Sequence, residues 1–332
     1  MHTSPVSDPA LNVRTIQRQL AARLPEARSA RAGEGTLELA TQGTDAPRLI
    51  SATVLEGDAL RAHRVRGAPS PAFRGFLDGA QRSEIASHLG TAPLVVGRVA
   101  AVIRERPERR LRTWRLPLRE TRLYAPRQQV SPSAWTVLHS LYGAQLVDTS
   151  DGAAEVGAHP FALRDAAVHE VQAHRERLEH RLAERWCAEE DEPLCIDGGI
   201  SGSEAVALSP RAVGVVKSHR TLYAEGAALA TVLGLGERER SSVFRITSPR
   251  RTAVASWYLR LRDATRRDPM WGLVRVEVAE RIGAGAGALA ERADQVSGWI
   301  LAEASPLALP DARWDRMVYG IRDCEEFLRA VR

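Results

Sequence analysis

The sequence predicts a mixed α/β fold in which one central sheet is flanked by helices. Three observations predict this class. Strand-like segments stand on both sides of one long helical segment, and helical segments close the chain. The 332 residues are 44% hydrophobic and 26% charged, which is typical of a globular chain with a sizeable core. No internal repeat of roughly 20–50 residues indicates a solenoid.

The N-terminal part is expected to be an extension, residues 1–70, before a main domain over residues 71–332. Apolar residues at helical spacing predict a helix over Ala10–Leu24. Two segments of alternating polarity, Thr36–Thr41 and Arg48–Leu55, predict a hairpin.

The main domain is expected to begin with strands. After the prolines at Pro69–Pro71, the apolar run Phe73–Asp78 predicts a short strand. Two longer β-type stretches follow, Leu94–Ile103 and Leu111–Leu118, and the charged turn Arg104–Arg110 joins them.

The middle of the chain predicts two helices and two strands. Pro132–Leu141 is expected to be helical, with its proline suitably placed at the start. His159–Cys187 carries apolar residues at helical intervals, and Pro193 cannot continue this helix. The strands Leu194–Asp197 and Ala212–Lys217 follow, separated by a loop rich in glycine and serine.

The C-terminal third is expected to add three helices and three strands. The expected helices are Leu222–Leu235, Ala288–Ala304 and Trp314–Val331, and the expected strands are Val243–Thr247, Ala255–Leu261 and Leu273–Val278. The glycine-rich stretch Gly283–Gly287 predicts a loop, because it lacks the lysine of a phosphate-binding loop.

Composition predicts a cytoplasmic protein with no membrane partner. The most apolar stretch, Ala92–Ile103, is shorter than the ~18 residues of a membrane span, and Arg98 interrupts it. The first residues lack the pattern of a secretory signal. Three cysteines without zinc-site spacing are expected to be buried thiols in a reducing compartment.

Two aspartates share one local pattern. Asp78 and Asp197 each end an apolar segment and each precede a glycine. Two such strands side by side would bring two carboxylates to one point at the sheet edge, where they could bind Mg²⁺ or Mn²⁺. The alternative is that both are ordinary Asp-Gly turns.

The chain contains a single lysine among its many arginines. All but one of the 46 basic residues are arginine, and the exception is Lys217. Its compact ammonium differs from a planar guanidinium, so it is expected to perform a role that arginine cannot, although chance retention remains the alternative. The strand that Lys217 ends is expected to pair with the Asp197 strand as a hairpin, which would bring the ammonium to a metal-bound phosphate.

Basic charge is concentrated in two segments. Arg98–Arg122 holds nine arginines against three acidic residues, and Glu237–Asp268 holds nine against four. Arginines with interleaved aromatic residues suit a nucleic-acid backbone and unstacked bases, and the alternative is a solvated surface in an arginine-rich chain. The candidate DNA-binding residues are Arg98, Arg112, Trp114, Arg115, Arg250, Arg251 and Arg260.

Several of these segments resemble the NurA nuclease family. Phe76-Leu77-Asp78-Gly79 and Cys195-Ile196-Asp197-Gly198 resemble its two aspartate strands, and Ala212–Ser218 is similar to its Gly-Val-Val-Lys strand. The later segments Trp257–Leu261, Leu273–Glu277 and Pro306–Arg313 resemble its later strands and its C-terminal metal-site region. The resemblance covers about residues 73–330.

The resemblance implies a ribonuclease H-like fold and manganese-dependent (or magnesium-dependent) processing of DNA ends by exonuclease or endonuclease activity. It also implies a homodimer that works with a HerA-like hexameric ATPase in DNA repair or phage defence. Carried onto this chain, it makes Asp78 and Asp197 metal ligands and places Lys217 at the scissile phosphate. A further acidic ligand is expected on the strand after Asp78, where Glu105 is the candidate.

One departure from the family pattern concerns the C-terminal region. Ala312-Arg313 stands where the family has an Ala-His pair, and Asp311 or Asp315 is the candidate replacement ligand. The departure also favours an alternative function, a catalytically weakened ribonuclease H-like subunit that binds DNA or scaffolds a defence complex. A third possibility is a protein that binds an acidic partner instead of DNA.

Overall fold

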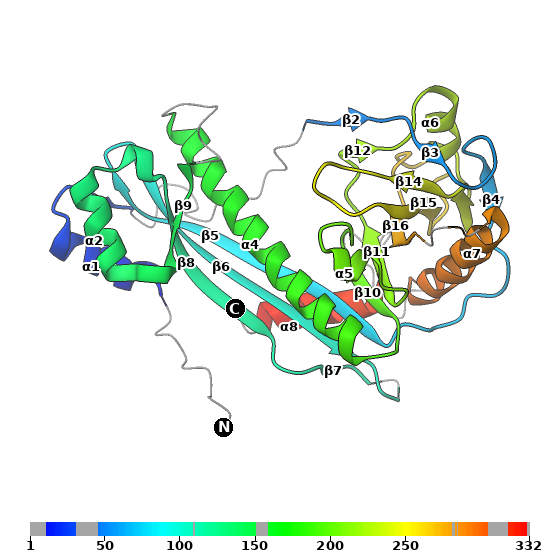
Figure 1. Ribbon diagram of the computed structural model, residues 1–332, viewed down its shortest axis with the longest axis horizontal. Coiled ribbons are helices and arrows are strands. Elements are labelled where there is room, and N and C mark those ends of the chain that lie inside the picture. Colours follow the sequence, from blue (N-terminus) through cyan, green and yellow to red (C-terminus); the bar gives the residue numbers. More distant parts are fainter. Residues whose placement is uncertain are drawn as a thin grey trace. The chain divides into compact units, whose positions relative to one another are not determined.

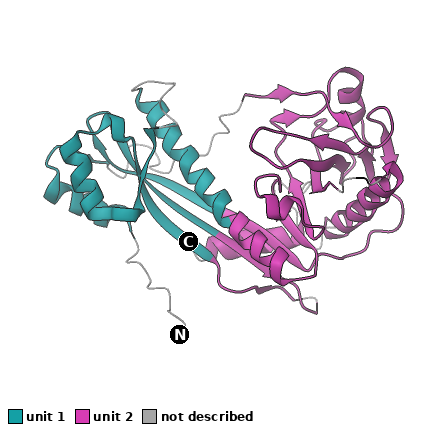
Figure 2. Cartoon of the chain, in the orientation of Figure 1, with its two compact units in different colours: residues 1–43, 80–100, 118–178 teal, residues 44–79, 101–117, 179–332 magenta. Residues whose placement is uncertain are grey.

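The protein is described from a computed structural model, in which residues 11–30, 46–108, 110–150, 159–280, 283, 285–304 and 318–330 are described (Figure 1). The chain divides into two compact units (Figure 2). Unit 1 comprises residues 1–43, 80–100 and 118–178, and unit 2 comprises residues 44–79, 101–117 and 179–332. Residue 70, where the sequence suggested a domain boundary, lies within the first segment of unit 2.

Unit 1 combines helices with one end of a sheet. Its helices are α1 (Val13–Arg23), α2 (Pro132–Tyr142) and the first part of α4 (Pro160–Glu189), with short 3₁₀ turns at Arg127–Gln129 and Gly143–Gln145. Its strands follow the order β5-β6-β8-β9, and β1 (Ala27–Ser29) pairs antiparallel with the end of β5. The bounds are Gly75–Leu89 for β5, Ala92–Glu105 for β6, Leu118–Ala125 for β8 and Leu146–Asp148 for β9.

The core of unit 1 lies between this sheet and helices α1 and α2. Buried Ile16 and Leu20 from α1 join Leu94 from β6, Leu123 from β8 and Leu138 from α2 in one apolar cluster. Both helices begin at residues whose side chains accept a backbone N–H bond, Asn12 for α1 and Ser131 for α2. Capping therefore explains why α2 begins at its expected start, Pro132, and why α1 begins at Val13 and not at the expected Ala10.

Unit 2 contains most of the mixed sheet, in the order β3-β14-β15-β16-β11-β10-β5-β6. The bounds of its strands are Arg48–Leu49 (β2), Thr53–Val54 (β3), Ala62–Arg64 (β4), Arg112–Thr113 (β7), Leu194–Asp197 (β10), Ala212–Val216 (β11), Thr221–Leu222 (β12), Glu239–Ser241 (β13), Phe244–Ile246 (β14), Val254–Arg260 (β15) and Leu273–Ala279 (β16). Its helices, besides the end of α4, are α5 (Glu204–Ala207), α6 (Gly226–Leu233), α7 (Ala286–Glu303) and α8 (Tyr319–Ala330).

The strand directions in unit 2 bring particular residues to one sheet edge. Strand β10 pairs in parallel with β5 on one side and β11 on the other. Leu77 lies opposite Ile196, so Asp78 and Asp197 reach the same level of the sheet. Asp197 lies opposite Val215, two residues before Lys217. The carboxyl ends of β10 and β11 therefore meet at one edge.

Several expected elements differ from the structure, and each difference has a local cause. The Asp197 and Lys217 strands do not form a hairpin. They are parallel neighbours, and a parallel pair needs a crossover, which here contains α5. The Leu111–Leu118 strand is interrupted after Thr113. The Trp114 N–H still donates to the Ile103 carbonyl, but Arg115 has a φ of 53°, which lies outside the β region.

The described half of the expected N-terminal hairpin pairs with later strands of the chain. The Arg48–Leu55 segment splits into β2, which pairs in parallel with β12, and β3, which pairs with β14. Its expected partner, Thr36–Thr41, lies outside the described residues. The expected helix Leu222–Leu235 begins only at Gly226, because Thr221 and Leu222 pair with β2.

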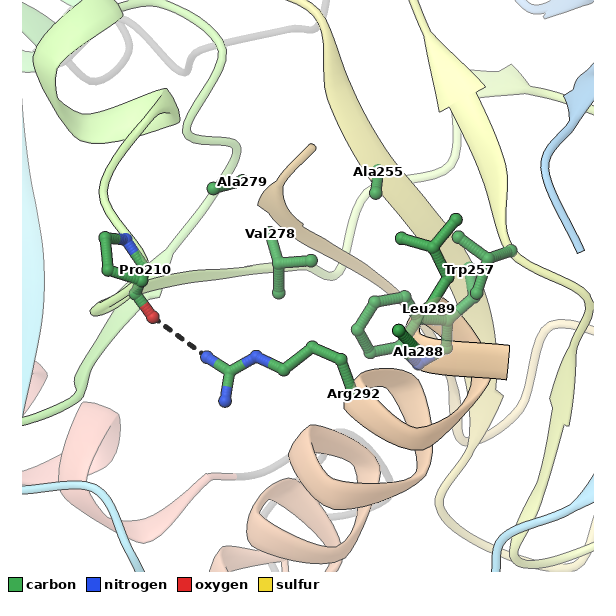
Figure 3. Close-up of a pocket in the computed structure, with 9 residues that line it drawn as sticks. Pro210, Ala255, Trp257, Val278, Ala279, Ala288, Leu289 and Arg292 are labelled. Atoms are coloured by element: carbon green, nitrogen blue, oxygen red, sulfur yellow. Dashed lines mark hydrogen bonds between the residues drawn. The ribbon is translucent and has the colours of Figure 1, made fainter. Parts of the chain in front are cut away.

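Helix α7 packs on the sheet of unit 2. The Trp257 indole on β15 donates to Ser297 of α7 at 2.9 Å. Beside this contact, α7 and strands β15 and β16 leave a small apolar pocket, across which Arg292 donates to the Pro210 carbonyl at 2.9 Å (Figure 3). Among the described helices, none is both long and apolar enough to cross a membrane.

Candidate metal centre

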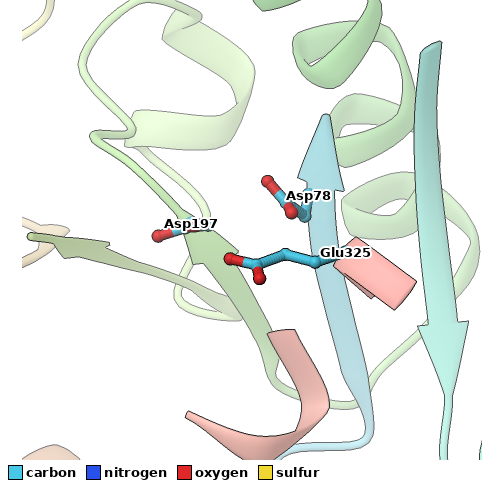
Figure 4. Close-up of side chains that lie close together, drawn as sticks. All are labelled: Asp78, Asp197 and Glu325. Carbon is cyan, nitrogen blue, oxygen red and sulfur yellow. The ribbon is translucent and has the colours of Figure 1, made fainter. Parts of the chain in front are cut away.

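Three carboxylates of unit 2 converge at the sheet edge. Asp78 comes from β5, Asp197 from β10 and Glu325 from α8 (Figure 4). One oxygen from each lies within 4.8 Å of the others. Two oxygens bound to one Mg²⁺ or Mn²⁺ ion lie about 3–4 Å apart, given metal–oxygen distances near 2.1 Å. Small side-chain movements would therefore bring all three onto one ion or a close pair, and the predicted juxtaposition of Asp78 and Asp197 is confirmed.

The two aspartates are positioned by the strands that precede them. Phe76 and Leu77 are fully buried before Asp78, and Cys195 is fully buried before Asp197. Because β5 and β10 pair in parallel, both carboxylates emerge at the same edge. Gly79 follows Asp78 where any side chain would collide with the Glu179 carboxylate. The absence of a side chain at Gly79 therefore leaves room for the Glu179 carboxylate beside Asp78.

Glu325 is positioned by helix α8. The ring of Phe76 packs directly against Gly320, and the Cys324 thiol donates to the Phe76 carbonyl at 3.2 Å. A salt bridge of 2.5 Å from Arg104 to Asp323 holds the same helix. These contacts fix α8 beside β5 and turn Glu325 toward the two aspartates.

The sequence prediction of the third ligand is wrong for Glu105. Its carboxylate is paired with Arg74 at 3.4 Å and with Arg112 at 3.0 Å, and it is not part of the described acidic cluster. Asp311 and Asp315 lie outside the described residues. Glu325 itself was missed, although the buried positions Ile321, Cys324 and Leu328 mark the face of α8 that it borders.

Lys217 supplies a cation at this cluster. Its Nζ lies 3.0 Å from Oδ1 of Asp197. The two side chains are 23% and 21% exposed, so both can be reached from solvent. Lys217 and Asp197 are close together, as expected, but their strands are parallel and do not form the expected hairpin.

Burial and neighbouring negative charges raise the pKa of Asp78 in the acidic cluster. The pKa of Asp78 is raised to about 8, first by burial of its carboxyl and then by the charges of Asp197 and Glu179. Lys217 and the Gly79 N–H, which donates to Asp78 Oδ1 at 2.8 Å, act in the opposite direction. A divalent cation would relieve this repulsion, and an all-carboxylate donor set suits Mg²⁺ or Mn²⁺.

The loop that follows Asp197 is held by a buried glutamate from β16. Glu277 accepts the Ile200 N–H at 2.8 Å and a 2.5 Å hydrogen bond from Arg275. A Cβ on Gly199 would come within 2.9 Å of the same carboxylate, so the loop lies directly on Glu277. This contact fixes the backbone immediately after the Asp197 ligand.

Two of the residues predicted to bind DNA are buried. Arg260 is fully buried and donates to the carbonyls of Leu233, Leu235 and Trp271. Trp114 is 6% exposed and donates to Glu190. Both predictions are wrong in this conformation, because neither side chain can reach a nucleic acid. Strand patterning alone did not distinguish an inward-facing arginine from a surface one.

The other predicted DNA-binding residues are accessible to different degrees. Arg98 is paired with Glu84, Arg112 with Glu105 and Arg115 with Glu189. Arg250 and Arg251 are exposed on the loop between β14 and β15. The β14–β15 loop lies at the sheet edge opposite to the edge that carries Asp197, so Arg250 and Arg251 do not flank the acidic cluster.

Comparison with known proteins adds no family to this geometry. No protein-family model matches the chain, and no curated protein matches it. The acidic cluster and the sequence resemblance are therefore the features that point to a function.

Proposed function

We propose that the protein is a metal-dependent deoxyribonuclease that hydrolyses phosphodiester bonds at DNA ends. The observation that carries the proposal is the convergence of Asp78, Asp197 and Glu325, with Lys217 beside them. Hard oxygen donors and one cation at a partly open sheet edge suit a phosphate substrate.

The sheet order supports a ribonuclease H-like fold. Strand β10 pairs in parallel with β5 and β11, and β6 and β8 follow on the other side of β5. Helix α4 precedes β10 in the chain. A mixed sheet in which two adjacent parallel strands carry acidic residues where their pairing stops agrees with what the NurA resemblance implies.

The proposed mechanism assigns distinct roles to the residues of the cluster. Asp78, Asp197 and Glu325 would hold Mn²⁺ or Mg²⁺, which when bound would polarise the scissile phosphodiester and offset its charge. Lys217 would place its ammonium against a non-bridging phosphate oxygen, where negative charge increases during hydrolysis. Asp197 would keep that ammonium in position through their 3.0 Å contact.

The biological setting follows from the sequence resemblance alone. It implies a cytoplasmic homodimer that works with a HerA-like hexameric ATPase in DNA repair or phage defence. Co-purification with the ATPase and size-exclusion chromatography of the full chain test these two partners.

A second candidate function is a DNA-binding or scaffold subunit with weakened catalysis. Arg313, at the position of the family's histidine, favours it. Glu325 favours the active nuclease, because it supplies a third carboxylate without any contribution from the segment around Arg313.

A nuclease assay on linear DNA separates the two candidates. The full chain is expected to degrade DNA with Mn²⁺ and not with EDTA, and Asp197→Asn is expected to lose at least about a hundredfold in rate. Asp58→Asn, which changes an exposed aspartate of the same unit, is the matched control and is expected to keep the wild-type rate. DNA binding without cleavage by the wild-type chain would favour the scaffold function.

A further inference from the structure

Two loops of the unit 2 sheet each carry a pair of adjacent exposed arginines. Residues 247–253 connect β14 to β15 and include Arg250 and Arg251. Residues 261–272 connect β15 to β16 and include Arg266 and Arg267. Among the described residues, none of these four guanidinium groups is in an ion pair with a carboxylate. The strand directions decide which of the two arginine pairs lies at the same sheet edge as the acidic cluster.

Strand directions place the two loops at opposite edges of the sheet. Asp197 lies opposite Val215, which lies opposite Val276, which in turn lies opposite Trp257. Because β16 is antiparallel to both β11 and β15, the β15–β16 loop lies at the edge where Asp197 and Lys217 are found. The β14–β15 loop lies at the other edge.

The β15–β16 loop is tied to the segment that carries Lys217. His219, two residues after Lys217, donates from Nε2 to the carbonyl of Leu273, the first residue after the loop, at 2.8 Å. Strands β16 and β15 are two and three positions from β10, a sideways distance of about 10–14 Å at ~4.8 Å per strand. At a rise of about 3.4 Å per nucleotide along the axis of a DNA duplex, this distance spans roughly three to four nucleotides.

The loop holds its own acidic residues in internal hydrogen bonds. Asp263 accepts from the Thr265 N–H at 3.1 Å, and Asp268 accepts from the Met270 N–H at 2.8 Å. The Arg267 guanidinium lies 5.2 Å from the centre of the Trp271 ring. The loop is therefore an ordered turn that presents Arg266 and Arg267 to solvent.

We propose that this loop binds the nucleic-acid backbone through Arg266 and Arg267, about three to four nucleotides from the phosphate held at the acidic cluster. This inference rests on the proposed nuclease function and names a substrate contact for it. Guanidinium groups bind phosphate oxygens without reading base sequence, as processing of arbitrary DNA ends requires.

The two loops offer a matched pair of variants. Arg266 and Arg250 both have a φ of 61°. Asparagine tolerates this left-handed backbone and removes the charge. The test variant is Arg266→Asn with Arg267→Gln, and the control is Arg250→Asn with Arg251→Gln. Both lose two charges, so net charge alone predicts the same effect from each.

Fluorescence anisotropy of a labelled linear duplex and a labelled single strand, with EDTA and at several salt concentrations, tests the proposal on the full chain. The test variant is expected to bind at least about tenfold more weakly, and its slope of log affinity against log salt is expected to fall by about 2. The control is expected to match wild type. Equal losses in both variants, no loss in the test variant, or no binding by wild type would overturn the proposal.

Two further measurements keep the result interpretable. If the double variant unfolds at a lower temperature than wild type, Arg266→Asn alone replaces it, with an expected slope change of about 1. Cleavage with Mn²⁺ is measured in parallel. If wild type binds DNA through this loop but does not cut it, the result contradicts the nuclease function and supports DNA binding by Arg266 and Arg267. If wild type cleaves DNA and the test variant binds DNA as tightly as wild type, the proposed DNA contact of the loop is wrong and the nuclease function stands.

Discussion

The Nζ of Lys217 lies 3.0 Å from the Asp197 carboxylate, and the register of two parallel strands produces this contact. Asp197 pairs with Val215, and residues two apart along a strand project from the same face. The only lysine of the chain therefore reaches the acidic cluster at a position where a guanidinium would be longer, planar and differently oriented.

Substitution of Lys217 by arginine tests whether this shape matters. Lys217→Arg keeps the charge, so an electrostatic surface role predicts an unchanged rate. Contact with the scissile phosphate predicts a loss of about tenfold or more in single-turnover cleavage, which is about 1.4 kcal/mol. DNA affinity, measured beside the rate, is expected to change little. A wild-type rate for Lys217→Arg would remove this lysine from the mechanism.

Replacement of Asp78 by asparagine is expected to stabilise the protein when no metal is bound. The pKa of Asp78 is raised to about 8, so the folded state binds a proton that the unfolded state releases above a pKa of about 4. Its burial therefore costs stability increasingly as the pH rises from about 4 to about 8. Thermal denaturation in EDTA should show a higher midpoint for Asp78→Asn at about pH 8 than for wild type, and a smaller difference at about pH 5.

The matched control for this experiment is the exposed aspartate of the Asp58–Arg61 pair, because the pKa of Asp58 is lowered by its hydrogen bond with Arg61. Asp58→Asn should show no gain in stability between about pH 5 and about pH 8. A lower midpoint for Asp78→Asn at every pH would mean that the charged carboxylate stabilises the fold.

A buried histidine in unit 1 predicts a second pH dependence. His174 donates from Nε2 to Glu120 at 2.8 Å, and its Nδ1 accepts from the Tyr124 hydroxyl at 2.8 Å. Burial and the charge of Arg122 lower the pKa of His174 below its usual value near 6.5, although Glu120 opposes the shift. The unfolded state therefore binds the proton first, and the stability from this group is lost as the pH falls below about 6.5.

His174→Gln removes this titration while keeping a polar side chain. Between about pH 7.5 and about pH 5, the free energy of unfolding of wild type should fall more than that of His174→Gln. Urea unfolding followed by circular dichroism measures the difference. The same pH slope in both proteins would show that His174 does not titrate differently in the folded and unfolded states.

Gly320 is expected to be essential for the seating of α8. A Cβ at this position would overlap the ring of Phe76, so Gly320→Ala should destabilise the protein by about 1–3 kcal/mol and displace Glu325. Mn²⁺ affinity should fall with it. Gly287→Ala in α7 is the control, because nothing lies near its Cβ and alanine favours a helix. Equal Mn²⁺ affinity in Gly320→Ala and wild type would show that α8 does not position a ligand.

The sequence predicted the parts of the site that depend on local pattern. Asp78 and Asp197 both follow buried apolar residues, and their convergence could be expected from this shared pattern. Strand β10 ends at Asp197 as expected, whereas β5 continues past Asp78 to Leu89. The main helices were also predictable from apolar spacing, and α4 and α2 begin within a residue of their expected starts.

The parts that depend on tertiary packing could not be predicted. Glu325 joins the cluster only because α8 docks on Phe76, a contact between residues far apart in the chain. Arg260 is buried and donates to three backbone carbonyls, and no sequence pattern distinguishes it from a surface arginine. The parallel pairing of β10 and β11 depends on the short crossover that contains α5, and a hairpin fitted the same spacing.

The most direct test of the acidic cluster compares Glu325→Gln with Glu105→Gln by Mn²⁺ titration calorimetry on the full chain. Glu325 lies with Asp78 and Asp197 and also pairs with Arg329 at 3.5 Å, whereas Glu105 lies outside the described acidic cluster and pairs with Arg74 and Arg112. If Glu325 is a metal ligand, Glu325→Gln weakens Mn²⁺ binding at least about tenfold and Glu105→Gln binds Mn²⁺ like wild type. Wild-type Mn²⁺ affinity in Glu325→Gln, or a loss confined to Glu105→Gln, would contradict this role of Glu325.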